Sequence, residues 1–165
     1  MSSLYIGVDP GNSGAMAFIS DGKLLDVFKM PLRDIGVTKE RNIIDLGKLY
    51  AFFAPFEKAY DRNIIALVED VHAMPKQGVT STFTFGRALG AIEGFLQGKG
   101  ILQYSMQPKA WQTIASVSSK KSSIDIANTR FKDYFTMRAK PNKDHNISDA
   151  VLIAWVASII YGNAA

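Results

Sequence analysis

Five consecutive apolar residues, Ile64 to Val68, stand between the polar residue Asn63 and the carboxylate of Glu69. A short apolar run without polar alternation is typical of a strand that is buried on both faces of a sheet. Such a strand needs helices above and below it, and helical patterns occur both before and after it in the chain. The sequence therefore predicts an α/β fold with one mixed sheet between helices.

The other predicted elements follow from periodicity and from turn and cap residues. Strands are predicted at residues 4–9, 15–20, 23–30 and 101–106, and helices at 43–60, 84–96, 108–115, 118–134 and 146–161. Loops are predicted at residues 31–41 and 71–82. Asp21-Gly22 predicts a hairpin turn, Asn42 a helix cap, and Pro55 a kink or break in its helix.

The composition excludes several classes of site. The sequence has no cysteine, which rules out disulfides, thiolate nucleophiles and zinc or iron–sulfur sites built on cysteine. This fits a reducing compartment, and no secretory signal is visible at the start. The longest uncharged stretch, residues 150–165, is too short to span a membrane. We therefore expect a cytoplasmic protein with no membrane partner.

Positive charge is concentrated late in the chain. Residues 120–143 hold seven basic and two acidic side chains, a charge of +5, whereas the whole chain carries +4. A basic region beside a nearly neutral body suits a protein that binds the phosphate backbone of a nucleic acid. A solvated surface rich in lysine would explain the same pattern, so the charge gains meaning only if catalytic residues lie nearby.

Three carboxylates occupy positions that predict a shared site. Asp9 ends the first strand, Glu69 ends the apolar strand, and Asp149 lies at the start of the last helix. Carboxylates brought together repel one another unless a cation neutralises them, and Mg²⁺ prefers such oxygen ligands. Two such ions can activate water and stabilise the leaving oxygen in phosphodiester hydrolysis. Separate structural roles, in a turn, at a strand end and in a helix cap, are the alternative.

Three segments in this order resemble a known family. Ile6-Gly7-Val8-Asp9-Pro10-Gly11, then Val68-Glu69-Asp70-Val71, then Ser148-Asp149-Ala150 resemble the RuvC family of Holliday-junction resolvases, its phage-type and organellar branches above all. The resemblance covers nearly the whole chain, so we expect residues 1–165 to form a single RuvC-like nuclease domain. It implies a ribonuclease-H-like fold, with a mixed five-stranded sheet flanked by helices, and a homodimer. It also implies Mg²⁺ or Mn²⁺, with two ions per active site, and paired nicks across a four-way DNA junction.

Carried over by position, Asp9, Glu69 and Asp149 would bind the metal. The family has a fourth group, an Asp or a His, one helical turn before the last Asp. Here we expect His145, as a metal ligand or a proton carrier, with Asn146 and Asp144 as the alternatives. The resemblance implies no nucleotide cofactor, and a host cytoplasm if the protein is phage-encoded.

Predicted DNA contacts lie in three places. His72 takes the position of the family's junction-centre aromatic residue, and Lys76 follows it in the same loop. Lys109, Lys120 and Lys121 lie where the family places basic contacts. Phe83 and Phe85 could stack on an unpaired base or be buried, and burial is expected for Phe85; Trp111 is expected to anchor the core. The helix predicted at 84–96 has many small residues and is the candidate dimer interface, although packing on its own sheet would also explain them.

Other functions stay open at this point. The segment from Gly7 to Gly14 also resembles the phosphate loop of sugar kinases and actin-like ATPases, but those proteins need two such domains. The remaining alternatives are a ribonuclease-H-like nuclease acting on flaps, forks or RNA–DNA hybrids, a non-catalytic protein that binds branched DNA, and a small-molecule phosphate enzyme.

Overall fold

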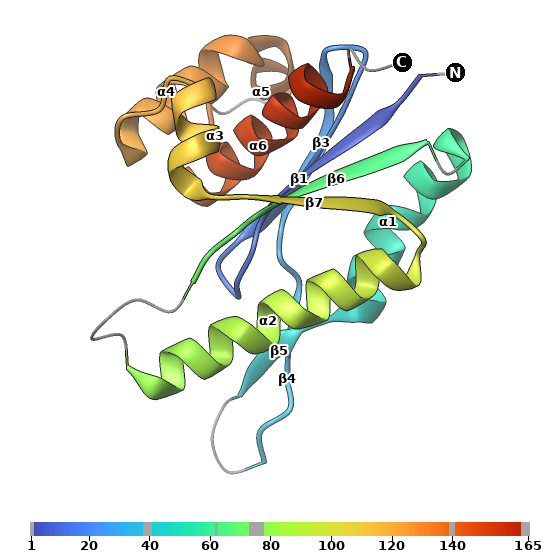
Figure 1. Ribbon diagram of the computed structural model, residues 1–165, viewed down its shortest axis with the longest axis vertical. Coiled ribbons are helices and arrows are strands. Elements are labelled where there is room, and N and C mark those ends of the chain that lie inside the picture. Colours follow the sequence, from blue (N-terminus) through green and yellow to red (C-terminus); the bar gives the residue numbers. More distant parts are fainter. Residues whose placement is uncertain (1, 38–40, 62, 73–77, 139–140, 163–165) are drawn as a thin grey trace.

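A mixed five-stranded sheet forms the centre of the molecule (Figure 1). The computed structural model describes residues 2–37, 41–61, 63–72, 78–138 and 141–162. The strands are β1 (Leu4–Asp9), β2 (Ala15–Ser20), β3 (Lys23–Lys29), β6 (Ile64–Glu69) and β7 (Leu102–Met106), in the order β3-β2-β1-β6-β7. β1 pairs antiparallel with β2 and parallel with β6. The predicted mixed five-stranded sheet between helices is confirmed.

Helices cover both faces of this sheet. One face carries α1 (Leu46–Tyr60) and α2 (Val79–Gly98), and the other carries α6 (His145–Gly162). Around α6 lie α3 (Pro108–Ile114), α4 (Lys120–Arg130) and α5 (Lys132–Met137). None of the described helices is long and apolar enough to cross a membrane.

The central strands feed two separate cores. In β6, Ile64, Ala66 and Val68 pack toward α1 and α2, whereas Ile65 and Leu67 pack toward α6. Because successive side chains of a strand point to opposite faces, this run is apolar on both sides. Burial on both faces is what the uninterrupted apolar sequence of β6 predicted.

A glycine brings α6 into close contact with β1. A Cβ atom added at Gly7 would overlap the backbone nitrogen of Ala154 and the backbone oxygen of Ala150. A side chain at position 7 would therefore force the helix away from the strand. The small residues on α6 and the missing side chain on β1 together set the position of the last helix over the sheet.

Some predicted boundaries are wrong. Residues 31–41, predicted as loop, contain β4 (Leu32–Asp34), which pairs antiparallel with β5 (Asn42–Ile44). Because Asn42 lies in β5, it does not cap α1; Asp45 does, and its Oδ1 accepts a hydrogen bond from the backbone N–H of Lys48 at 3.1 Å. Pro55 lies inside α1, which continues without a break.

Two further helices differ from the predicted ranges. α2 begins at Val79, five residues before the predicted start, which shortens the preceding loop. The helix predicted over residues 118–134 is divided into α4 and α5 at Phe131, whose φ of −113° and ψ of 39° are not helical. The hairpin at Asp21-Gly22 is confirmed, since both residues have the positive φ that a tight two-residue turn requires.

Candidate active site

Asp9 and Glu69 lie next to each other at one edge of the sheet and face α6. Val8 pairs with Val68 in the parallel β1–β6 ladder, so the residues that follow them end neighbouring strands. Asp9 is two residues after Gly7, which faces α6, and Glu69 is two residues after Leu67, which packs in the core beneath α6. The alternation of side chains therefore directs both carboxylates toward the last helix.

The third predicted carboxylate reaches the same place from α6. This helix begins at His145, so Asp149 lies in its second turn, next to the buried Ser148 and Ala150. The close contact of α6 with β1 at Gly7 brings this turn over the strand end that carries Asp9. The structure thus brings Asp9, Glu69 and Asp149 together from β1, β6 and α6.

Two buried side chains hold two of these carboxylates in place. The indole Nε1–H of Trp111, at the centre of α3, donates to Oε1 of Glu69 at 2.8 Å. The hydroxyl of Ser123, on α4, donates to Oδ1 of Asp149. Both Trp111 and Ser123 are fully buried. Trp111 is therefore the core anchor that the sequence predicted, and it also fixes the orientation of an acidic side chain.

Burial and mutual repulsion change the proton affinity of the cluster. Burial, followed by the charges of Glu69, Asp149 and Asp144, raises the pKa of Asp9 to about 8. Burial also raises the pKa of Glu69 and of Asp149, although the hydrogen bonds from Trp111 and Ser123 act in the opposite direction. These effects show that the carboxylates lie close enough to influence one another's ionisation.

The carboxylate oxygens of Asp9, Glu69 and Asp149 are donors of the kind that a hard divalent cation prefers, but this structure does not arrange them as a set of ligands around one ion. Among the described residues, no three His, Asp or Glu side chains are arranged to hold one metal ion. Within that part of the chain, no Lys, Arg or His side chain forms an ion pair with Asp9, Glu69 or Asp149. Half-buried carboxylates that form no ion pair are the oxygen donors that Mg²⁺ or Mn²⁺ would stabilise.

Two candidates for the fourth group border the cluster. His145 lies one helical turn before Asp149 on α6, and a positive charge on it would counteract part of the rise that burial causes in the pKa of Asp149. Asp144 raises the pKa of Asp9, so it is also near, and it forms an ion pair with Lys29 at the end of β3. Burial alone would raise the pKa of Asp144, but Lys29 and the backbone N–H of Asn146 lower it overall. Asp144 therefore keeps its negative charge beside Asp9.

The predicted DNA contacts lie at different distances from the cluster. Burial raises the pKa of Asp149, and the positive charge of Lys120, at the start of α4, counteracts part of this rise, so Lys120 is a basic side chain near that carboxylate. Lys121 and Lys109 are exposed. His72 is exposed just beyond β6, with its Nδ1 3.6 Å from Oδ1 of Asp70. Lys76 lies outside the described residues.

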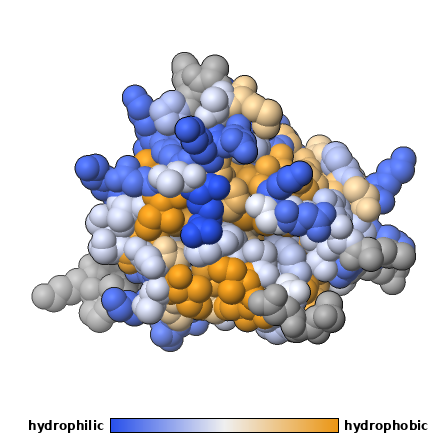
Figure 2. All heavy atoms as spheres, turned by 90° about the horizontal axis from the view of Figure 1, so that it is seen from above, coloured by the Kyte–Doolittle hydropathy of each residue, from blue (hydrophilic) through white to orange (hydrophobic). Residues whose placement is uncertain are grey.

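Part of the basic segment serves the fold instead. The guanidinium of Arg130 lies 3.6 Å from the ring centre of Trp155, and Nη2 of Arg138 pairs with Oδ1 of Asp26 at 2.7 Å. The exposed lysines remain on the side of the molecule formed by α4 to α6, where hydrophilic side chains project between hydrophobic patches (Figure 2). The charge count alone therefore overstated the surface that is free to bind phosphate.

The small residues of α2 fall on two faces. Ala88 is buried against the sheet, as expected if the small residues pack the helix on its own sheet. Gly86, Gly90, Gly94 and Gly98 recur every four residues on an exposed face, where an added Cβ would meet no atom within 4 Å. Phe83, 65% exposed, lies beside this row, whereas the half-buried Phe85 has its ring against Gly11. The expected burial of Phe85 is thus met in part.

The sequence did not indicate two residues of the site. Ser123 and Lys29 contact Asp149 and Asp144, respectively, from elements that are distant in the chain. Ser123 is a serine within a charged segment and Lys29 a lysine at a strand end, and neither belongs to a sequence motif that would indicate a role in the site. Only the packing of α4 on α6, and of β3 beside β2, brings them to the carboxylates.

Two solved structures with a similar fold are both of RuvC from Thermus thermophilus. No protein-family profile and no curated protein matches the sequence. The Thermus thermophilus RuvC structure in complex with Holliday junction substrate aligns with a TM-score of 0.61 and 14% identity, covering 98% of this chain and 96% of that chain. A second structure of T. thermophilus RuvC aligns with a TM-score of 0.57 and the same identity and coverage. The chain has a RuvC-like fold. The predicted resemblance is thereby confirmed at the level of the fold.

Proposed function

We propose that this protein is a metal-dependent, structure-selective DNA endonuclease that resolves four-way junctions by paired symmetrical nicks. The observation that carries this proposal is the convergence of Asp9, Glu69 and Asp149 at one edge of the sheet, with the pKa of Asp9 raised to about 8 by burial and by its acidic neighbours. The RuvC-like fold supports the choice of substrate, because a RuvC structure of that fold was determined with Holliday junction substrate.

The reaction is hydrolysis of a phosphodiester. Water attacks the phosphorus, the bond to the 3′ oxygen breaks, and the products carry a 5′-phosphate and a 3′-hydroxyl. Asp9, Glu69 and Asp149 would hold Mg²⁺ or Mn²⁺, two ions per site, which would supply charge stabilisation and a more acidic water. Trp111 and Ser123 orient Glu69 and Asp149 for this task.

The remaining residues position DNA and protons. His145 lies at the edge of the cluster, one turn from Asp149, where an imidazole can hold or move a proton near neutral pH. Lys120 lies beside the same carboxylate. Lys109, Lys121 and His72 are exposed, and each is close in the sequence to a residue of the site. We assign these four side chains, together with Lys76, to contacts with the junction backbone or its unpaired bases.

Substitutions that keep the shape of each carboxylate test the assignment. Asp9→Asn, Glu69→Gln and Asp149→Asn should each reduce Mg²⁺-dependent cutting of a mobile four-way junction by at least about 100-fold. Junction binding should persist, since each change removes a negative charge and leaves the basic surface intact. Asp125→Asn, on the exposed side of α4, is the matched control and should cut like the wild type. Normal cutting by the three variants would show that the site is misassigned.

The same assay separates two alternatives. Equal cutting of junctions, flaps and RNA–DNA hybrids by the wild type would favour a general ribonuclease-H-like nuclease. Binding of junctions without any cutting would favour a non-catalytic protein. The second alternative gains some support from Asn146, which stands where a carboxylate could be, and from the absence of a three-residue ligand set among the described residues.

Paired nicks require two active sites, and we propose that two copies of the chain supply them. The exposed glycine row of α2, with Phe83 beside it, lets another helix approach closely. The active site of each copy would then contact one of two strands of the branched DNA, which is the partner of the dimer. The test of this assembly is given with the whole molecule in the Discussion.

A further inference from the structure

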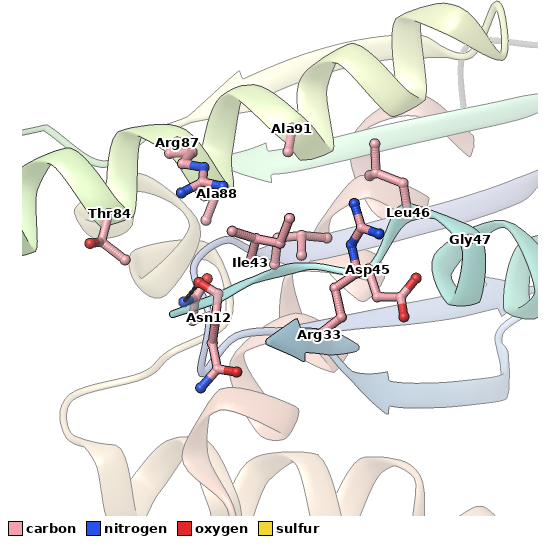
Figure 3. Close-up of a pocket in the computed structure, with 12 residues that line it drawn as sticks. Asn12, Arg33, Ile43, Asp45, Leu46, Gly47, Thr84, Arg87, Ala88 and Ala91 are labelled. Carbon is pink, nitrogen blue, oxygen red and sulfur yellow. Dashed lines mark hydrogen bonds between the residues drawn. The ribbon is translucent and has the colours of Figure 1, made fainter. Parts of the chain in front are cut away.

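A cavity of about 320 Å³ lies on the side of the sheet opposite α6. It is enclosed by β4 and β5, the first turn of α1, and α2 (Figure 3). Asn12 forms part of its wall and donates from Nδ2 to the backbone oxygen of Asn42 at 3.2 Å. Because Asn12 belongs to the turn that follows Asp9, the cavity lies near the end of β1 that carries this carboxylate, on the opposite face of the sheet.

Two arginines line this cavity. Arg33 extends from β4 toward the start of α1, and Arg87 comes from α2 (Figure 3). Neither guanidinium forms a hydrogen bond or an ion pair with another residue in the described part of the chain. Two guanidinium groups that line one cavity supply the positive charge and the N–H donors that a phosphate group attracts.

The first turn of α1 adds backbone donors to the same cavity. Asp45 caps this 15-residue helix through the N–H of Lys48, and the N–H groups of Leu46 and Gly47 donate to no acceptor among the described residues. Leu46 and Gly47 both line the cavity. Free N–H groups at a helix start, together with the helix dipole, favour a negatively charged ligand.

The rest of the lining suits a base more than a free anion. Ile43, Ala88 and Ala91 give an apolar wall, and the Asp45 carboxylate lies among them as an acceptor. An apolar wall can contact the face of a base, and a carboxylate can accept from its exocyclic amino group. The negative charge of Asp45 would repel a doubly charged free phosphate more than a singly charged phosphodiester.

We propose that this cavity binds one unpaired nucleotide of the DNA strand, a short distance along the strand from the cut position. The phosphodiester contacts Arg33, Arg87 and the start of α1, and the base lies on the wall formed by Ile43 and Ala88. This inference rests on the proposed function, because it takes the substrate to be branched DNA. It adds a contact on the opposite side of the sheet from the carboxylates.

Salt-dependent binding tests the phosphate contact. For a four-way junction in EDTA, the double variant Arg33→Ala/Arg87→Ala should bind about tenfold more weakly at 100 mM NaCl, with a log–log salt slope lower by about one. Lys23→Ala/Lys58→Ala is the matched control: it removes the same charge from exposed residues outside the cavity and should keep the wild-type slope. An arginine double variant with wild-type affinity and slope would overturn the proposal.

A second pair of variants tests the cavity without changing charge. Thr84→Trp fills it from α2 and should weaken junction binding by a similar factor, whereas Ser81→Trp, exposed on the same helix but outside the cavity, should not. A junction with single methylphosphonate linkages should show one position near the cut where neutralisation weakens the wild type but not the arginine double variant. If every position weakens both proteins equally, no phosphate occupies this cavity.

Failure of the proposed function has a different signature. A wild type that neither cuts a junction with Mg²⁺ nor prefers it to duplex DNA would contradict the resolvase assignment. The cavity is then probed with a short single-stranded oligonucleotide, whose affinity should still fall in Arg33→Ala/Arg87→Ala and in Thr84→Trp. Equal affinity of all these proteins for the oligonucleotide would overturn the cavity proposal by itself.

Discussion

Asp9 is a residue whose charge the fold controls strongly. Burial and its acidic neighbours raise the pKa of its carboxyl group to about 8, against 3.8 in an unperturbed chain. Between these two values the folded protein holds a proton that the unfolded chain has lost. Stability must therefore fall as the pH rises through this range, and the loss is complete above pH 8. The raised pKa values of Glu69 and Asp149 act in the same direction.

This linkage gives the first prediction at the residue scale. In EDTA, the unfolding temperature of the wild type should fall by about 5 °C or more between pH 5 and pH 8.5, as measured by circular dichroism. Asp9→Asn should show a smaller fall and unfold at a higher temperature than the wild type at pH 8, because it places no negative charge in the cluster. Glu69 and Asp149 leave it a residual slope.

Addition of Mg²⁺ at pH 8 completes this test. A cation that binds the folded chain should raise the unfolding temperature of the wild type, and should raise it much less in Asp9→Asn. An unfolding temperature that increases with pH in EDTA, or one that responds to Mg²⁺ equally in both proteins, would contradict a cluster of half-buried carboxylates with raised pKa values.

Some residues of the site could be predicted from the sequence and others could not. Asp9 and Glu69 could be predicted to meet because each ends an apolar strand, and parallel neighbours end at the same edge. Asp149 could be predicted because an acidic side chain on an apolar helix needs a neutralising environment. The hydrogen bond from Trp111 to Glu69 could not, since it depends on where α3 lies after β7.

At the scale of elements, local sequence signals predicted whether a segment is a helix or a strand better than they predicted where it begins and ends. The capping box that Ser119 forms with Ser122 starts α4 within the predicted range. β4 and β5 were missed because three-residue strands carry too little periodicity to distinguish them from a loop. The division at Phe131 has no glycine or proline to indicate it.

The contact between β1 and α6 gives a prediction at this scale. Gly7→Ala places a methyl group against backbone atoms of Ala150 and Ala154, which cannot rotate away as a side chain could. We expect a loss of about 1–3 kcal/mol or more in unfolding free energy, measured by urea denaturation. Cutting should fall even where the variant is folded, because Asp149 moves with the helix.

A glycine in open surroundings provides the control for this variant. Gly78→Ala adds the same methyl group at the residue before α2, where no atom lies within 4 Å, and should lower stability by no more than about 1 kcal/mol. If both variants were equally stable and active, the close contact of α6 with β1 would not be what positions Asp149.

For the whole molecule, the sequence predicted one mixed sheet with helices on both faces. It did not predict which functional residues lie on which face. Alternation within β1 and β6 divides the molecule into two cores, one under α6 and one under α1 and α2. The carboxylates belong to the first side, and the cavity with Arg33 and Arg87 to the second. This division follows from strand pairing over long sequence distances, which local patterns do not encode.

Two copies of the molecule are needed for paired nicks, and the exposed row of glycines on α2 is where we expect them to meet. Gly90→Glu/Gly94→Glu places like charges where two such helices would approach, and glutamate is a better helix former than glycine, so folding should not suffer. Light scattering should show a dimer for the wild type and a monomer for this variant at the same concentration, with nicks that no longer come in symmetrical pairs. Ala51→Glu/Ala59→Glu, exposed on α1, should remain dimeric. A glutamate variant of α2 that still dimerises and still cuts both strands together would place the interface elsewhere.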